Sequence, residues 1–147
     1  AGPNIMKGYW KDPKATERVL DDKGYHTGDL AYRDEDGFFH IVGRKDHLLK
    51  VGGHRLNPSE IEDVVMESGH VIETIVLGIP DPVLGHKLAA LVTPKNNGIS
   101  ESELLRYCAK KLPKYKLPCR VKFISRFPYK TSGKIDRTKC FEMLTKF

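Results

Sequence analysis

The amino-acid sequence predicts a small α/β domain that follows a strand-rich segment. Two helices with clear start signals alternate with short apolar strands after residue 46, and 39% of the chain's 147 residues are hydrophobic. Helices that alternate with strands pack as layers on a sheet. We therefore expect a two-layer domain over 46–147, in which helices pack on a β-hairpin and a short mixed sheet.

Residues 1–45 carry a weaker pattern. The first 24 residues hold several glycines and prolines and show no sustained helical or strand period. Two apolar strands within 25–42 flank an acidic turn that Gly37 closes. Two strands cannot form a core alone, so we expect 1–45 to be the end of a larger upstream domain.

The stretch 43–62 predicts a joint, a hairpin and the start of a helix. A charged triplet, Arg44-Lys45-Asp46, interrupts two apolar segments and is a candidate joint. Gly52-Gly53 predicts a two-residue turn after a strand over 47–51, because glycine takes positive φ without steric cost. Asn57, followed by a proline and an acidic residue, predicts a helix N-cap.

The remaining elements alternate in type along the chain. A second helix begins at Ser100, which stands in capping-box spacing to Glu103, and Pro113 stops it. The predicted order is a helix over 58–68, strands over 71–79 and 87–93, a loop at 96–98, the second helix, a strand over 121–124, a loop over 128–134 and a short helix from about residue 137.

Composition excludes several classes of protein. The three cysteines are odd in number and widely spaced, which indicates free thiols rather than disulfides or a zinc site. The six histidines show no ligand spacing, and His47 and His54 are expected as exposed strand residues, so no metal site is assigned. No apolar run approaches the roughly 20 residues that cross a bilayer, and no signal peptide is evident. We expect a cytoplasmic protein without a membrane span.

Positive charge is concentrated in the last third of the chain. Thirteen lysines and arginines stand against three acidic residues over 103–147, within a total net charge of +6. Such a segment could bind nucleic acid, a membrane surface or a polyanionic nucleotide or coenzyme. Aromatic residues interleave with the lysines, which favours single-stranded nucleic acid. No nucleic-acid signature is present, however, and Phe123 lies in an apolar strand pattern.

Two polar positions are candidate chemical sites. Lys134 follows a glycine in the small polar turn Thr131-Ser132-Gly133-Lys134, where it could deliver an ammonium into a neighbouring cleft. The turn is not a P-loop, because Pro128 stands where that motif needs its first glycine. Asp29 ends a strand-turn junction and could accept hydrogen bonds from a ribose diol. A solvated lysine and an ordinary turn aspartate are the alternatives.

Four motifs together resemble the C-terminal part of the adenylate-forming enzymes, the superfamily of acyl-CoA synthetases, nonribosomal peptide synthetase adenylation domains and luciferases. They are, in order, Thr27-Gly28-Asp29, Gly43-Arg44-Lys45-Asp46, Lys50-Val51-Gly52-Gly53-His54-Arg55 with Glu60-Ile61-Glu62, and Pro128-Tyr129-Lys130-Thr131-Ser132-Gly133-Lys134-Ile135-Asp136-Arg137. The stretches 76–82 and 113–118 are also typical of this superfamily. The resemblance covers nearly the whole chain.

The resemblance implies a role for each matched residue. Asp29 and Arg44 match residues that bind the ribose of ATP, and Asp46 matches the hinge about which the small domain rotates between two half-reactions. Lys134 matches the lysine that meets the acyl carboxylate and the α-phosphate during adenylation. The mobile, positively charged ammonium of a lysine is suited to stabilise the negative charge that develops at the phosphate during this step.

For the second half-reaction, Gly53 matches the hairpin tip that leaves room for a pantetheine thiol. Lys50 and Arg55 match positions near the same surface. The basic last third of the chain then suits the phosphates of coenzyme A or an acidic carrier protein.

The implied function is that of an ATP-dependent ligase for a small carboxylic acid, with Mg²⁺ carried by the nucleotide and coenzyme A as acceptor. An adenylation domain that loads a carrier protein is the alternative, and a basic nucleic-acid-binding module is a distant one. The superfamily's phosphate loop is absent from residues 1–26. We therefore expect a C-terminal fragment that is inactive without its N-terminal domain.

Overall fold

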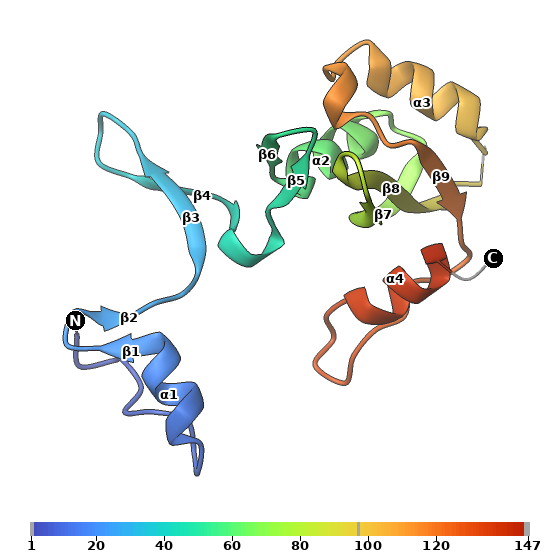
Figure 1. Cartoon of the computed structure of the whole chain (residues 1–147). Helices are drawn as coiled ribbons and strands as arrows, with labels where there is room; N and C mark the ends of the chain where they lie inside the picture. Colours follow the sequence, from blue (N-terminus) through green and yellow to red (C-terminus); the bar gives the residue numbers. More distant parts are fainter. Residues whose placement is uncertain (1, 97, 146–147) are drawn as a thin grey trace. The chain divides into compact units, whose positions relative to one another are not determined.

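The computed structural model describes residues 2–96 and 98–145, and the chain divides into two compact units, Ala1–Asp46 and His47–Phe147. Figure 1 shows the order of the elements along the chain. Asn97, in the loop predicted at 96–98, lies outside the described residues.

The first unit consists of one helix and two antiparallel strand pairs. Its elements are α1 (Pro13–Val19), β1 (Leu20–Asp21), β2 (Gly24–Tyr25), β3 (Asp29–Arg33) and β4 (Phe39–Arg44). The two strands predicted within 25–42 are confirmed as β3 and β4. Residues 1–24 show no sustained period in the sequence, yet they contain the helix α1. The Asp12 carboxylate accepts a hydrogen bond from the Ala15 amide at 2.9 Å, and Pro13 occupies the first helical turn, so a capped helix of seven residues forms.

The first unit has no core of its own among its described residues. None of residues 2–46 is buried. The β3–β4 pair instead exposes large apolar side chains, and the Phe38, Phe39 and Ile41 residues remain 68%, 73% and 71% accessible. Contiguous apolar patches of large size are rare on the surface of monomeric soluble proteins.

The second unit is built on a five-stranded sheet. Its strands are β5 (Leu49–Val51), β6 (His54–Leu56), β7 (Val71–Asp81), β8 (Gly85–Pro94) and β9 (Arg120–Phe123). The order is β6-β5-β8-β7, with β9 pairing in parallel to β8 and all other pairs antiparallel. Its helices are α2 (Pro58–Glu67), α3 (Glu101–Ala109) and α4 (Arg137–Thr145), with a short 3₁₀ turn η2 (Lys114–Lys116). Another 3₁₀ turn, η1 (Lys45–His47), includes the last residues of the first unit and the first residue of the second.

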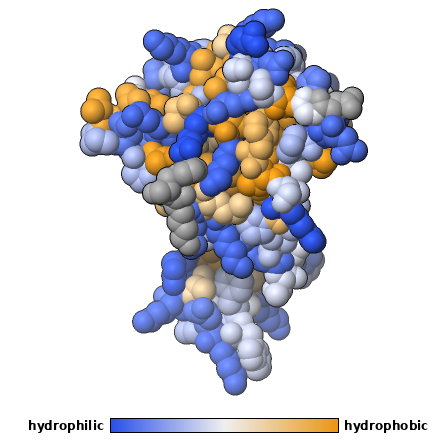
Figure 2. Space-filling model, turned by 90° about the vertical axis from the view of Figure 1, so that its right-hand side faces the viewer, coloured by the Kyte–Doolittle hydropathy of each residue, from blue (hydrophilic) through white to orange (hydrophobic). Residues whose placement is uncertain are grey.

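Side chains that alternate along the central strand β8 divide the core between two faces. Leu88, Ala90 and Val92 pack with residues of α2 and α3, whereas Ala89 and Leu91 pack with residues of α4. The predicted α/β class is confirmed, but helices cover both faces of the sheet, so the domain has three layers instead of the predicted two (Figure 1). In Figure 2 hydrophobic side chains remain visible between the hydrophilic ones on the face that is shown.

The predicted caps and turns of the second unit are confirmed. Asn57 accepts a hydrogen bond from the Ser59 amide at 3.2 Å, and Ser100 forms both halves of a capping box with Glu103. Gly52 and Gly53 have φ of 54° and 85°, so the hairpin turn has the positive values that glycine permits. The first hairpin strand is shorter than predicted, because residues up to His47 form the turn η1.

Candidate functional site

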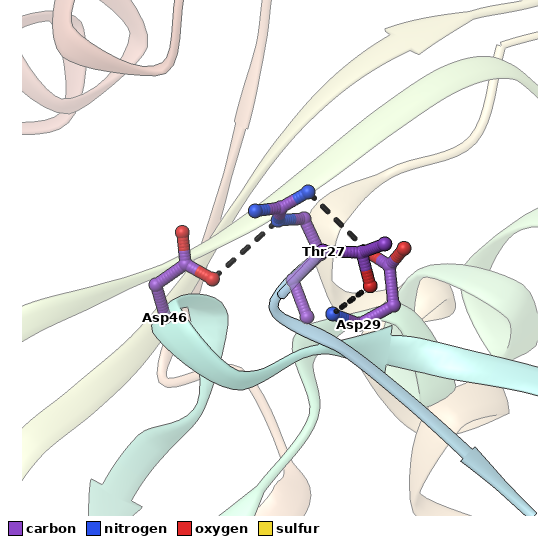
Figure 3. A network of polar contacts seen from close by, with 4 residues as sticks. Thr27, Asp29 and Asp46 are labelled. Carbon is purple, nitrogen blue, oxygen red and sulfur yellow. Dashed lines mark hydrogen bonds and ion pairs between the residues drawn. The ribbon is translucent and has the colours of Figure 1, made fainter. Parts of the chain in front are cut away.

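Asp29 and Arg44 face each other across the β3–β4 pair. They are register partners, and Arg44 Nη1 lies 3.4 Å from Asp29 Oδ1. The Asp29 amide donates to Thr27 Oγ1 at 3.1 Å, which fixes the turn that leads into β3. Asp29 and Arg44, which the family resemblance assigns to the ribose of ATP, therefore lie side by side (Figure 3).

Asp46 belongs to the same ion-pair network. Arg44 Nε lies 3.4 Å from Asp46 Oδ1, so one guanidinium contacts two carboxylates, as Figure 3 shows. Gly28 makes this approach possible: its φ is 75°, and a Cβ there would lie 3.1 Å from Arg44 Nη2. The sequence motifs supplied the three charged residues, but they gave no sign that Asp46 shares Arg44 with Asp29.

A hollow of about 540 Å³ adjoins this network within the first unit. Its wall includes Tyr9, Tyr25 and His26 together with Arg44 and Asp46. The volume falls within the range of small-molecule sites. Aromatic rings and a charged guanidinium at one hollow are a chemical combination that suits a nucleoside and its phosphates.

The glycine-tipped hairpin lies in the second unit and is fixed at its base. The Gly52 amide donates to the Leu84 carbonyl at 2.9 Å, and His86 Nδ1 lies 3.1 Å from the Lys50 carbonyl oxygen. A Cβ on Gly53 would meet no atom within 4 Å. The tip is thus an open position on a fixed support, and a side chain there would project into free space.

Lys50 and Arg55 are register partners across this hairpin, and both are exposed. Like charges directly opposite each other on a sheet are destabilising. The pair is well placed to bind an anion, which would relieve the repulsion between the two cations.

His54 is exposed, as predicted, and its ring stacks on Tyr115 of η2. The ring centroids are 4.0 Å apart and the rings are inclined by 13°. The stack joins the hairpin to the segment 113–118 that the sequence identified as a separate motif. Sequence reasoning missed this contact, because the two residues stand 61 positions apart in a sequence of unrelated pattern.

Lys134 projects from a turn whose backbone is closed by hydrogen bonds. The Lys130 amide donates to the Lys134 carbonyl at 2.8 Å, and the Gly133 amide donates to the Lys130 carbonyl at 3.0 Å. Tyr129 bridges to Ile135 at the base of the turn, and Gly133 has φ of 77°. The Lys134 side chain is exposed, and no group among the described residues forms a hydrogen bond or ion pair with its ammonium.

Several basic and aromatic residues of the last third make internal contacts. Lys116 pairs with Glu60, Lys111 Nζ lies 2.5 Å from Glu67, and Lys122 donates to the Met143 carbonyl at 2.6 Å. Phe127 is buried. The interleaved pattern that favoured single-stranded nucleic acid is therefore in part the pattern of a folded core and of its ion pairs.

The three cysteines carry free thiols, as the sequence indicated. Cys108, Cys119 and Cys140 are free, and burial raises the pKa of Cys140 to about 11. Within 2–96 and 98–145 no three acidic, histidine or cysteine side chains gather as metal ligands. None of the described helices has the length and apolar character to cross a membrane.

Comparison with known proteins finds CoA ligases among the relatives of this chain. A long-chain-fatty-acid–CoA ligase of Salmonella typhimurium is 40% identical over 136 residues, which cover 92% of this chain and 24% of the relative. A feruloyl-CoA synthase of Amycolatopsis is 41% identical over 136 residues, which cover 92% of this chain and 28% of the relative. The chain thus spans about a quarter of the length of the curated relatives it matches.

Solved structures of the same kind superpose on nearly the whole chain. ATP-bound MatB from Rhodopseudomonas palustris gives a TM-score of 0.88 at 34% identity, over 99% of this chain and 29% of that one. The o-succinylbenzoate CoA synthetase MenE from Bacillus subtilis, in complex with its acyl-adenylate intermediate, gives a TM-score of 0.86 at 33% identity. This superposition covers 95% of the present chain and 28% of that one. Residues 60–134 match the AMP-binding enzyme C-terminal domain. Because this match spans half of the chain, the chain belongs to the family of AMP-binding enzyme C-terminal domains.

Proposed function

We propose that this chain is the C-terminal part of an ATP-dependent ligase that converts a carboxylic acid to an acyl-adenylate and then to a coenzyme A thioester. The unpaired ammonium of Lys134, exposed on a hydrogen-bonded glycine turn, is the observation that carries the proposal. Family membership and the ligase names of the relatives support it.

Lys134 is the proposed catalytic residue of the first half-reaction. A carboxylate oxygen attacks the α-phosphorus of ATP, the bond to pyrophosphate breaks, and negative charge builds on the oxygens around phosphorus. An ammonium offers three donors to those oxygens and retains its charge throughout. Because the Lys134 side chain has no partner in the described part of its own unit, no ion pair must break before it meets this charge.

Asp29 and Arg44 are the proposed ribose-binding residues. The Asp29 carboxylate keeps free lone pairs beside its contact with Arg44, and these can accept hydrogen bonds from a ribose diol. The hollow beside Arg44 has room for a small-molecule group. Mg²⁺ would be carried by the phosphates of the nucleotide, which supply most of its non-water ligands in such sites.

Gly53 is the proposed point of entry for the thiol in the second half-reaction. Free space around the tip admits a narrow pantetheine arm, which a side chain would obstruct. The exposed pair Lys50 and Arg55 can bind phosphate groups of the acceptor. Free coenzyme A is the first candidate acceptor, because the names of the relatives are those of CoA ligases, and a carrier-bound pantetheine is the second.

The apolar surface of β3–β4 is the proposed contact with the N-terminal part of the parent enzyme. Phe38, Phe39 and Ile41 are exposed in a unit that has no buried residue over 2–46. A larger domain that covers them would give residues 1–45 the core that they lack. Asp46, the last residue of the first unit, is then the proposed hinge.

The parent protein tests this function directly. With ATP and a panel of carboxylic acids it should catalyse acid-dependent exchange of pyrophosphate into ATP, and on addition of coenzyme A it should release AMP and form a thioester. Thioester formation only on a carrier protein would select the second acceptor. Release of ADP in place of AMP would contradict the proposal.

A further inference from the structure

On the outer edge of β7, where none of the described strands pairs, two side chains bind the backbone of Val76. β7 pairs with β8 along its other edge, where Val76 is the register partner of Ala90. On the outer side the Val76 amide donates to Glu62 Oε1 at 2.8 Å, and Arg137 Nη2 donates to the Val76 carbonyl at 3.3 Å. One residue of the edge therefore has both of its backbone groups satisfied by an acid and a base.

The acid and the base come from opposite faces of the sheet. Glu62 lies on α2, whose buried residues Ile61 and Val65 join the core on one face, whereas Arg137 begins α4, which packs on the other. Their side chains approach to 3.9 Å, from Arg137 Nη2 to Glu62 Oε1. The pair thus fastens both helical layers to the same point of the strand.

Burial makes the Glu62 carboxylate dependent on its polar partners. The Glu62 side chain is only 21% exposed, and burial raises the pKa of its carboxyl, an effect that the Val76 amide and Arg137 oppose. A carboxylate in such a place needs its partners, since an uncompensated buried charge is costly. Loss of Arg137 or of the Glu62 charge should therefore destabilise the structure around this contact.

The turn that carries Lys134 ends at this contact. Arg137 stands three residues after Lys134, and the Asp136 amide donates to the Pro128 carbonyl at 2.8 Å, which closes the turn. At its other end Tyr129 Oη donates to Glu73 Oε2 of the same strand β7 at 2.6 Å. Both ends of the turn are thus fixed to β7, while the described contacts leave the Lys134 side chain free.

We propose that Glu62 and Arg137 are positioning residues, which hold the turn over 128–136 so that Lys134 meets the reacting groups during adenylation. The catalytic part of this inference rests on the proposed function. The structural part, that the pair fixes the turn, can be measured without any substrate. A misplacement of about 1 Å by a remote change can cost about 100-fold in rate, so the pair should affect the first half-reaction without touching substrate.

The test uses Glu62→Gln, which keeps an oxygen for the Val76 amide and removes only the charge. We expect amide hydrogen exchange over 129–136 to become about tenfold faster, and kcat for pyrophosphate exchange in the parent enzyme to fall about 10- to 100-fold with KM for ATP nearly unchanged. Arg137→Lys keeps the charge without the planar fork of the guanidinium. It should give an exchange rate and a kcat that lie between those of the wild type and of Glu62→Gln. Glu67→Gln on the same helix breaks the exposed pair with Lys111, which does not contact the turn, and should leave both at the wild-type level.

The outcomes separate this inference from the proposed function. Unchanged exchange over 129–136 in both Glu62→Gln and Arg137→Lys overturns it, as does faster exchange with an undiminished adenylation rate. A parent enzyme that does not adenylate any acid refutes the proposed function. In that case the exchange comparison still decides whether the pair fixes the turn.

Discussion

Arg44 Nε lies 3.4 Å from Asp46 Oδ1, so the last residue of the first unit is ion-paired to a residue that also contacts Asp29. A proposed ribose contact and a proposed hinge therefore share one guanidinium. The planar fork of arginine can direct separate N–H groups at the two carboxylates, which the single ammonium of lysine cannot do in the same geometry.

Arg44→Lys should raise KM for ATP in the parent enzyme by about tenfold or more, the effect of one lost charged hydrogen bond. KM for the acid should change little, because the first unit is assigned to the nucleotide. Steady-state kinetics of pyrophosphate exchange measure both constants. Arg33→Lys, on the same strand pair and contacting the Gly37 carbonyl, is the matched control, and an equal effect of the two substitutions would contradict the ribose assignment.

Asp81 should make the second unit more stable above about pH 4 than at lower pH. Its carboxylate lies 2.6 Å from Lys87 Nζ and accepts from the Val83 and Leu84 amides at 3.0 and 2.9 Å, and these contacts lower the pKa of Asp81 from 3.8 to about 2. A lowered pKa contributes stability that is present above the unfolded-state value and is lost as the pH falls through the folded-state value.

Asp81→Asn should therefore lower the urea midpoint at pH 7, and its difference from the wild type should shrink between about pH 4 and pH 2. Asp63→Asn, an exposed position on α2, should change little at either pH. A difference that stays constant down to pH 2 would show that the Asp81 charge is not responsible.

Most of the fold could be predicted from the sequence, because its signals are local. The caps at Asn57 and Ser100 and the turn at Gly52-Gly53 each lie within a few residues of the structure that they determine. The helix α1 was missed because the glycines and prolines around it obscure a period, although Asp12 followed by proline is a readable start signal. That α4 covers the second face of the sheet depends on packing, which no local signal contains.

The site was predictable only in its parts. Motifs identified Lys134 and Gly53 as candidates, but contacts between residues far apart in sequence had no signal. Glu62 and Arg137, and His54 and Tyr115, meet through the topology of the sheet. Their contacts follow from the way the chain folds back, and so they required the structure.

Hydrogen exchange on the 147-residue chain should distinguish the two units. Amides up to about Arg44 should exchange fast, because their strands have no buried side chains over them. Amides of β7 and β8 after Ile72 should be protected by the core on both faces of the sheet. Mass spectrometry of peptides from each unit measures this, and uniform protection over the whole chain would show that residues 1–45 do not need a further domain.

A pair of variants tests the two-step assignment of the second unit. Gly53→Leu places a branched side chain at the open tip of the hairpin, where φ is 85°. It should obstruct the thiol in the second half-reaction and leave pyrophosphate exchange intact. Lys134→Ala should do the reverse, since it removes one charge from the adenylation site and alters neither the hairpin nor the stability of the unit, because Lys134 is exposed.

The most direct measurement is carried out on Lys134→Ala in the parent enzyme, with each half-reaction assayed separately. Acid-dependent pyrophosphate exchange should fall about 100- to 1,000-fold, the usual cost of one lost electrostatic contact to a transition state. Thioester formation from supplied acyl-adenylate should proceed at the wild-type rate. An equal fall in both half-reactions, or no fall in either, would contradict the assignment of Lys134 to adenylation.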